Sequence, residues 1–206
     1  MINKKVVLHI GMHKTATTWL QKNYFPLIDG LLYNPHETYV KLTNIFRYGY
    51  QDCDINDFTV HLKTLKCDSL FLSTEMLSGD LFSGYSQFDK HMKIINNCFS
   101  GWDIKIIFVV REPVSWVISC YKESIHEHHY QDLSVFVGIS EPDRFSEAMV
   151  NFKLEEFSIS RMLDILNKNF LGNFHVLFFE DFINDSKKFQ NDICSILEVE
   201  KFYEPN

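Results

Sequence analysis

The sequence predicts an α/β fold in which a parallel β-sheet carries helices on both faces. Short apolar runs alternate along the chain with segments of helical period, and this alternation is typical of a parallel sheet. The clearest run, residues 104–110, is almost continuously apolar, as expected of a strand buried on both faces. A length of 206 residues suits one domain with a full core, so we assign 1–206 to a single domain.

The individual elements follow from apolar runs, helical spacing and the positions of proline. The predicted strands cover residues 5–10, 31–34, 70–73, 104–110 and 174–179. Helices are predicted over residues 15–25, 36–50, 55–66, 86–100, 113–130, 152–171 and 185–198. Phe88, Met92 and Ile95 show the helical spacing most clearly, and Pro113 stands in a first helical turn, where proline is tolerated. Residues 131–150 are predicted to form a surface loop.

The first strand runs into a segment rich in hydroxyl groups. Gly11 is followed by Lys14 and by threonines at 15, 17 and 18, just before an apolar helical pattern. A helix N-terminus offers unpaired N–H groups and partial positive charge, and Lys14 adds a full charge. The segment is not a Walker A motif, because no glycine stands directly before the lysine; Gly11 lies three residues before Lys14. It predicts a phosphate or sulfate site; the competing interpretation is an ordinary strand–glycine–helix turn with polar caps.

A second anion-binding group follows the strand 104–110. Arg111 comes directly after this strand, and Ser119 lies about two helical turns later on the same side. A guanidinium binds phosphate oxygens in pairs, so Arg111 and Ser119 suit a terminal phosphate. The alternative is that Arg111 pairs with Glu112 or caps the helix. Ligands of open parallel sheets bind at the carboxyl ends of the strands, so both groups are expected at one edge.

The two motifs together resemble those of a known enzyme family. His13-Lys14-Thr15-Ala16-Thr17-Thr18-Trp19 resembles the 5′-phosphosulfate loop of sulfotransferases that use 3′-phosphoadenosine 5′-phosphosulfate (PAPS). Residues 106–113, with Ser119 downstream, resemble the 3′-phosphate motif of that family, and residues 174–181 resemble its last strand. The resemblance covers residues 5 to 198 and is closest to short bacterial-type members. It implies a three-layer, P-loop NTPase-like sulfotransferase fold and in-line transfer of a sulfonate group from PAPS to a hydroxyl acceptor.

The resemblance also implies roles for individual residues. Lys14 would contact the oxygen that bridges phosphate and sulfonate and would stabilise the leaving charge, so no metal is expected. The 5′-phosphate site would comprise His13, Lys14, Thr15, Ala16, Thr17 and Thr18, and the 3′-phosphate site Arg111 and Ser119. PAPS is a co-substrate in this scheme.

A base must take the proton of the acceptor hydroxyl, and Glu75 is the first candidate. Glu75 follows the strand 70–73, and a partly dry cleft would raise the pKa of its carboxyl group. The alternative is a solvated loop carboxylate or a helix cap. His13 and His61 are weaker candidates for the base.

Two further clusters are predicted to have structural roles. The run from His126 to Tyr130 contains three histidines, but it lacks the HExxH spacing of zinc proteases, so we predict a polar helix end there. Glu180 and Asp181 are predicted to cap or bond the neighbouring loop region.

Composition limits the partners. A net charge of −7 argues against nucleic acid and sulfated polyanions, and favours a sugar, a lipid headgroup or a small alcohol or phenol as acceptor. The five cysteines, at 53, 67, 98, 120 and 194, are scattered and predict reduced thiols. The first apolar run is too short for a signal peptide and no stretch suits a membrane span, so we expect a cytoplasmic protein without stable membrane insertion.

The sequence departs from the larger family members, and two other functions stay open. The basic, glycine-containing C-terminal loop that covers the nucleotide in those members is not seen in residues 182–206, so residues 131–150 are the candidate for closing the adenine side. One alternative function is a kinase-like P-loop enzyme, which the missing second glycine argues against. The other is a non-catalytic nucleotide-binding protein on the same fold, which Lys14 and Glu75 argue against.

Overall fold

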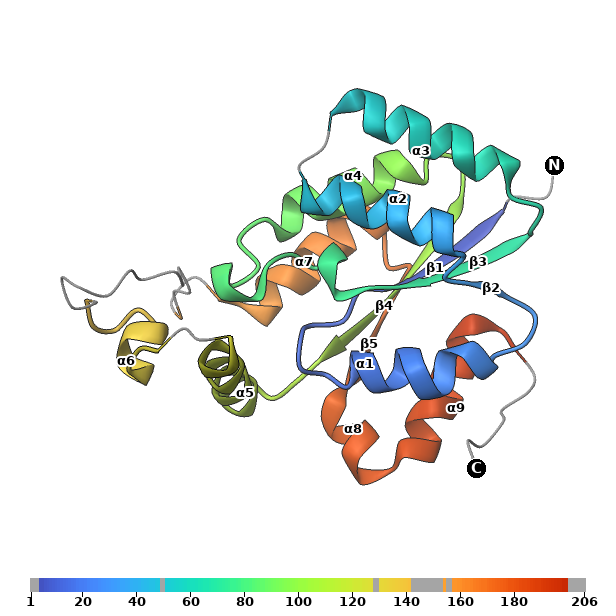
Figure 1. Ribbon diagram of the computed structural model, residues 1–206. Coiled ribbons are helices and arrows are strands. Elements are labelled where there is room, and N and C mark those ends of the chain that lie inside the picture. The colour runs from blue at the N-terminus through green and yellow to red at the C-terminus, as the bar shows by residue number, and fades with distance from the viewer. Residues whose placement is uncertain (1–3, 49–50, 128–129, 142–153, 155–156, 200–206) are drawn as a thin grey trace.

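The computed structural model describes residues 4–48, 51–127, 130–141, 154 and 157–199, apart from the side chains of 52 and 53. Its centre is a parallel sheet of five strands in the order β2-β3-β1-β4-β5 (Figure 1). The strands are β1 (Lys5–His9), β2 (Leu32–Tyr33), β3 (Ser69–Ser73), β4 (Asp103–Val110) and β5 (Phe174–Phe178). Lys5 lies opposite both Ser69 and Asp103, so the carboxyl ends of the central strands share one edge.

Helices cover both faces of this sheet and make three layers (Figure 1). One face carries α2 (His36–Arg47), α3 (Asp52–Thr64), α4 (Phe88–Cys98) and α7 (Ile159–Phe170). The other carries α1 (Thr17–Trp19) with its continuation as a π-helical turn (Leu20–Tyr24) and a 3₁₀ turn (Phe25–Leu27), together with α8 (Phe179–Asn184) and α9 (Ser186–Leu197). After β4 come α5 (Pro113–His126) and α6 (Leu133–Phe136), and short 3₁₀ turns span Glu75–Leu77 and Leu81–Ser83.

The alternation of side chains along each strand divides the core into two parts. Val6 and Leu8 of β1 pack into the cluster beneath α2, α3, α4 and α7. Val7, which lies between them, packs with Tyr24 and with Phe189 of α9 on the opposite face. This two-sided burial explains why the strands read as apolar runs and not as alternating patterns. The predicted three-layer parallel α/β fold is confirmed.

The predicted strands agree with the structure to within one residue at each end, but several helix predictions were wrong. The helix predicted over 113–130 ends at His126, where Glu127 is the C-cap residue, and residues 128–129 lie outside the described residues. The predicted loop 131–150 contains the short helix α6, which has too few residues to show a period. The helix predicted over 152–171 begins at Ile159, after Ser158 caps it by accepting from the backbone N–H of Arg161. Residues 142–153 and 155–156 lie outside the described residues.

Glu180 and Asp181 lie inside helix α8 and not in a loop after the last strand. The chain passes from β5 to α8 without a break, so the apolar run of the strand gave no sign of the change. Glu180 nonetheless bonds the neighbouring segment as predicted, since its carboxylate accepts from the backbone N–H of Glu112 at 3.0 Å.

The described cysteine side chains, Cys67, Cys98, Cys120 and Cys194, are free thiols. Within the described parts of the chain, we find no helix with both the length and the apolar character needed to cross a membrane.

Candidate active site

A cavity of about 680 Å³ opens at the carboxyl edge of the sheet. Segments that follow β1, β3, β4 and β5 all contribute to its lining. Of the residues predicted for the site, those that line the cavity are His13, Lys14, Ala16, Thr17, Thr18, Glu75, Arg111 and Ser119. Its volume lies within the range of small-molecule sites.

The loop after β1 is held in an unusual backbone conformation. Lys14 and Ala16 both have left-handed backbone angles, with φ of 63° and 61°. Such angles cost energy in residues other than glycine and persist only where the surroundings enforce them. Below the loop, Met12 donates its backbone N–H to the carbonyl of Val109 at 2.9 Å, which continues the pairing with β4. The loop therefore starts from a fixed base.

Gly11 and Thr15 meet closely beneath this loop. A Cβ atom on Gly11 would lie 3.2 Å from the Thr15 hydroxyl and 3.2 Å from Cβ of Val109, so the position needs glycine for its small size. Thr15 is 1% exposed, and its hydroxyl donates to the carbonyl of Met12 at 2.5 Å. The Thr15 side chain therefore lies under the loop, while Thr17 and Thr18 reach the cavity.

Arg111 joins the two predicted anion sites. Its Nη1 donates to the backbone carbonyl of Lys14 at 3.0 Å, and its Nε donates to the Ser115 hydroxyl at 3.2 Å. The guanidinium also lies over the ring of Phe179, 4.6 Å from the ring centroid. Glu112, and not Arg111, caps α5: its carboxylate accepts from the next two available backbone N–H groups at 2.9 and 2.7 Å. A guanidinium has five N–H groups, so the two bonds leave donors for a ligand.

Glu75 lies beside His13 at the cavity wall. Burial raises the pKa of Glu75, while a hydrogen bond from Thr17 and the charge of Lys14 oppose that rise. His13 Nε2 lies 3.9 Å from a carboxylate oxygen of Glu75. Burial lowers the pKa of His13 to about 4, so His13 is neutral at pH 7. A neutral imidazole with so low a pKa is a weak base, which favours Glu75.

Tyr85 orients the His13 ring. Its hydroxyl oxygen accepts from the backbone N–H of His13 at 2.8 Å and lies 3.1 Å from His13 Nδ1. The Tyr85 hydroxyl can then donate its proton to Nδ1. We therefore assign the single N–H of the neutral ring to Nε2, the atom nearer to Glu75. Trp116, whose ring lies against that of Tyr85, holds the same residue by donating from its indole N–H to the His13 carbonyl at 3.1 Å.

The other histidine candidates lie away from the cavity lining. His61 Nε2 is 2.9 Å from the hydroxyl of Thr38, so this ring links α3 to α2. His126 is exposed at the end of α5, and residues 128–129 lie outside the described residues. Among the residues that the structure describes, there is no group of three or more histidines, cysteines or carboxylates arranged to hold a metal ion.

Three contacts at or behind the cavity involve residues that were not predicted for the site. Glu123 of α5 forms an ion pair with Lys14, at 2.9 Å between Oε2 and Nζ. Its spacing of four residues from Ser119 places both on one helix face, and this signal was available in the sequence. Aromatic side chains form one wall, where Trp19 and Phe182 of α8 lie 5.2 Å apart between ring centroids. The hydrogen bond between Tyr85 and His13 joins residues 72 positions apart, so no local sequence pattern indicated it.

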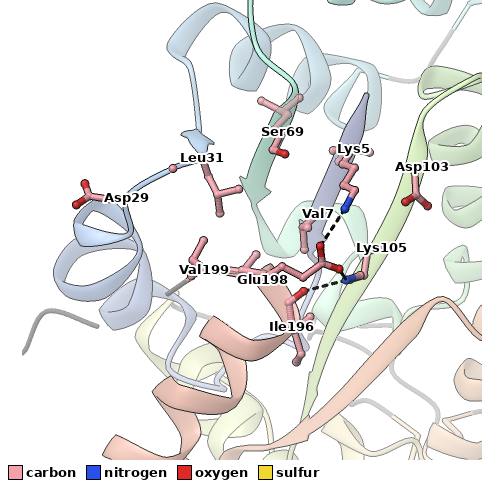
Figure 2. Close-up of a pocket in the computed structure, with 14 residues that line it drawn as sticks. Lys5, Val7, Asp29, Leu31, Ser69, Asp103, Lys105, Ile196, Glu198 and Val199 are labelled. Carbon is pink, nitrogen blue, oxygen red and sulfur yellow. Dashed lines mark hydrogen bonds and ion pairs between the residues drawn. The ribbon is translucent and has the colours of Figure 1, made fainter. Parts of the chain in front are cut away.

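A second cavity, of about 430 Å³, lies at the amino ends of the strands (Figure 2). Lys5 and Lys105 both point toward Glu198 there, and each bonds its carboxylate at 2.9 Å. These two lysines lower the pKa of Glu198 to about 2. The pairing of Glu198 with these two lysines fastens the end of α9 to the sheet. The predicted site residues gather instead in the cavity at the carboxyl edge, which is the candidate active site.

The comparisons with known proteins agree with this fold. No protein-family model matches the sequence, and no curated protein matches it. A sulfotransferase from Alicyclobacillus acidocaldarius superposes with a TM-score of 0.64 at 12% identity, covering 98% of this chain and 84% of that one. Mouse sulfotransferase SULT7A1, complexed with PAP, gives 0.53 at 14% identity, covering 97% and 61% of the two chains.

The sulfotransferase domain from the curacin biosynthetic pathway gives a TM-score of 0.51 at 10% identity, covering 98% of this chain and 76% of that one. At such low identities the likeness concerns the fold and not the chemistry. The parallel five-stranded sheet with its cavity at the carboxyl edge therefore has the fold of the sulfotransferases.

Proposed function

We propose that this protein transfers a sulfonate group from PAPS to a hydroxyl compound. The observation that carries the proposal is that Lys14 and Arg111 line one cavity and are joined by a hydrogen bond of 3.0 Å. A donor with anionic groups at two positions needs two such cationic groups, held at a fixed separation. The complex of the mouse relative with PAP, the nucleotide product of such a donor, supports the same interpretation.

The lining residues suit the parts of this donor. We assign the 5′-phosphate to the loop from His13 to Thr18, with the Thr18 hydroxyl as a donor and the Thr17 hydroxyl joining it on leaving Glu75. We assign the 3′-phosphate to Arg111 and Ser119. Thr15 is assigned a supporting role, since its hydroxyl is bonded to Met12 beneath the loop. The aromatic wall offers the purine ring a surface for stacking.

The reaction that we propose is an in-line displacement at sulfur. The acceptor oxygen forms a bond to sulfur while the bond from sulfur to the bridging phosphate oxygen breaks. Lys14 stabilises the negative charge that develops on that oxygen, and Glu75 receives the acceptor proton. His13 lies beside Glu75, with its Nε2 3.9 Å from the carboxylate, and forms part of the wall that buries it. Because Lys14 and the helix N-terminus supply positive charge at the reacting group, the proposed mechanism needs no metal.

The acceptor is proposed to be an uncharged hydroxyl compound, such as a sugar, a lipid headgroup or a small alcohol or phenol. Besides Glu75 and Glu123, the cavity lining includes Asp80 and Glu127, and these carboxylates would repel a sulfated polyanion. We also propose a cytoplasmic location and a single domain over 1–206, since the free thiols suit a reducing compartment.

The test has two parts. Adenosine 3′,5′-bisphosphate (PAP) should raise the melting temperature without magnesium, and by more than ATP does at the same concentration. A screen of hydroxyl compounds with a donor labelled in the sulfonate group should then yield a labelled product. A shift that only ATP with magnesium produces would favour the kinase-like alternative, and PAP binding without any transfer would favour the non-catalytic one.

A further inference from the structure

The ion pair between Lys14 and Glu123 spans the two halves of the candidate active site. Lys14 belongs to the loop after β1, whereas Glu123 extends from α5, the helix that also carries Ser119. Their side chains are 32% and 34% exposed, and both line the cavity. An ion pair with this degree of exposure adds little to the stability of a fold, because water screens it. Its position at the reacting amine calls for another explanation.

Donor binding requires Lys14 to exchange partners. The amine that is assigned to the leaving oxygen is occupied by the Glu123 carboxylate at 2.9 Å. An anionic donor must therefore draw Lys14 away from Glu123, and the carboxylate is left beside an anionic ligand. Both effects oppose nucleotide binding, and both reverse when the nucleotide leaves.

We propose, on the basis of the function proposed above, that Glu123 is a positioning residue that holds Lys14 between turnovers and competes with the bound nucleotide for its charge. After transfer, Lys14 is paired with the new negative charge on the 5′-phosphate of PAP. Glu123 is the neighbouring anion that takes Lys14 back, so it promotes product release. When no nucleotide is bound, Glu123 holds the Lys14 amine next to the loop, so that the side chain does not extend into solvent.

The variant Glu123→Gln tests this role, because glutamine keeps the size of the side chain and removes its charge. We expect the Kd for PAP to fall about tenfold, since a close opposing charge is removed. The KM for the donor should fall with it. The value of kcat should stay level or decrease, because the tighter product leaves more slowly. The melting temperature of the free protein should change little.

Glu127→Gln is the matched control, since Glu127 is one turn further along the same face of the helix region and also lines the cavity. Equal tightening in both variants would mean that general charge, and not the Lys14 contact, governs binding, and would overturn the proposal. A double-mutant cycle separates the same possibilities: in a Lys14→Gln background, Glu123→Gln should tighten PAP binding by much less.

The outcomes also separate this inference from the proposed function. If the unaltered protein binds PAP and Glu123→Gln binds it no more tightly, the role of Glu123 is overturned and the proposed function stands. If neither the unaltered protein nor any variant binds PAP, both are overturned. Tighter binding that depends on Lys14 and is absent from Glu127→Gln supports the exchange of partners.

Discussion

Nη1 of Arg111 donates to the backbone carbonyl of Lys14 at 3.0 Å. The two residues lie 97 positions apart, one after β4 and the other after β1, the central strand of the sheet. Lys14 has a left-handed backbone, so this bond helps to hold a conformation that a lysine rarely adopts. Arg111, the proposed ligand of the 3′-phosphate, thus also supports the loop that carries the proposed catalytic amine of Lys14.

Arg111→Ala should consequently impair both binding and turnover. We expect PAP affinity to fall about 10- to 100-fold, the usual effect of losing charged hydrogen bonds. We also expect kcat at saturating PAPS to fall, because the Lys14 carbonyl loses its donor. Ser115→Ala is the control, since it removes a partner of Arg111 and leaves the guanidinium in place. A weaker affinity with an unchanged kcat would show that the loop is held without Arg111.

Lys14→Ala should reduce sulfonate transfer by about 100-fold or more, as losing a donor to a developing charge does in other enzymes. The melting temperature should move little, because the ion pair with Glu123 is one-third exposed. Steady-state transfer assays and thermal denaturation measure the two effects. Lys122→Ala removes a neighbouring exposed lysine of α5 and serves as the control. Transfer at the unaltered rate in Lys14→Ala would exclude the role assigned to its amine.

Glu75→Gln should lower turnover and raise stability at neutral pH. Burial raises the pKa of Glu75, so the folded state binds the proton more tightly than the unfolded state. The free energy of unfolding therefore falls as the pH rises from the ordinary value, 4.5, through the raised one. The glutamine side chain does not titrate, so the melting temperature of Glu75→Gln at pH 7 should exceed that of the unaltered protein.

The pH profile of kcat gives a second measure of Glu75. Activity should decline on the acid side at a pH above the ordinary glutamate pKa, because protonated Glu75 cannot act as the base. Burial raises the pKa of this carboxyl group most; the Thr17 hydrogen bond and the charge of Lys14 lower it, and the charge of Glu123 raises it. Neutral His13 lies 3.9 Å away. The residual activity of Glu75→Gln should lack this acid limb. An acid limb of the same position in the variant would assign it to another group.

The features that could be predicted from the sequence are those formed by residues close together along the chain. The three central strands were found because they are buried on both faces, and the edge strands β2 and β5 were found as short apolar runs although their residues are half-buried or exposed. The Lys14 loop and Arg111 were found because each follows a strand. The contacts of Glu123 and Tyr85 were missed because they join residues 109 and 72 positions apart, although the spacing of Glu123 from Ser119 could have placed its side chain on the same helix face. The change from β5 to α8 was missed because Phe178 and Phe179 continue one apolar run across it. Long-range pairing and abrupt changes of backbone thus account for what sequence patterns did not reveal.

Acid should destabilise the fold through His9, which lies fully buried beneath the loop. Its Nδ1 is 2.8 Å from the Ser73 hydroxyl, and Gln21 donates to the same hydroxyl oxygen at 3.1 Å. Burial lowers the pKa of His9 to about 3, from an ordinary value of 6.5. The unfolded chain therefore binds a proton that the folded chain excludes between these values. The contribution of His9 to the free energy of unfolding is therefore unchanged above pH 6.5, and below that pH it falls by about 1.4 kcal/mol per pH unit.

His9→Asn tests this directly, because asparagine can still bond Ser73 but does not titrate. We expect the variant to be less stable at pH 7, since the ring contact with Phe25 is lost. Its stability should nevertheless decline less steeply between pH 6 and pH 5, by about 1.4 kcal/mol per unit, in urea unfolding. His13 keeps part of the slope, because its own pKa is also lowered. His126→Gln controls for the loss of an exposed imidazole, and equal slopes in His9→Asn and the unaltered protein would show that His9 accepts its proton without unfolding.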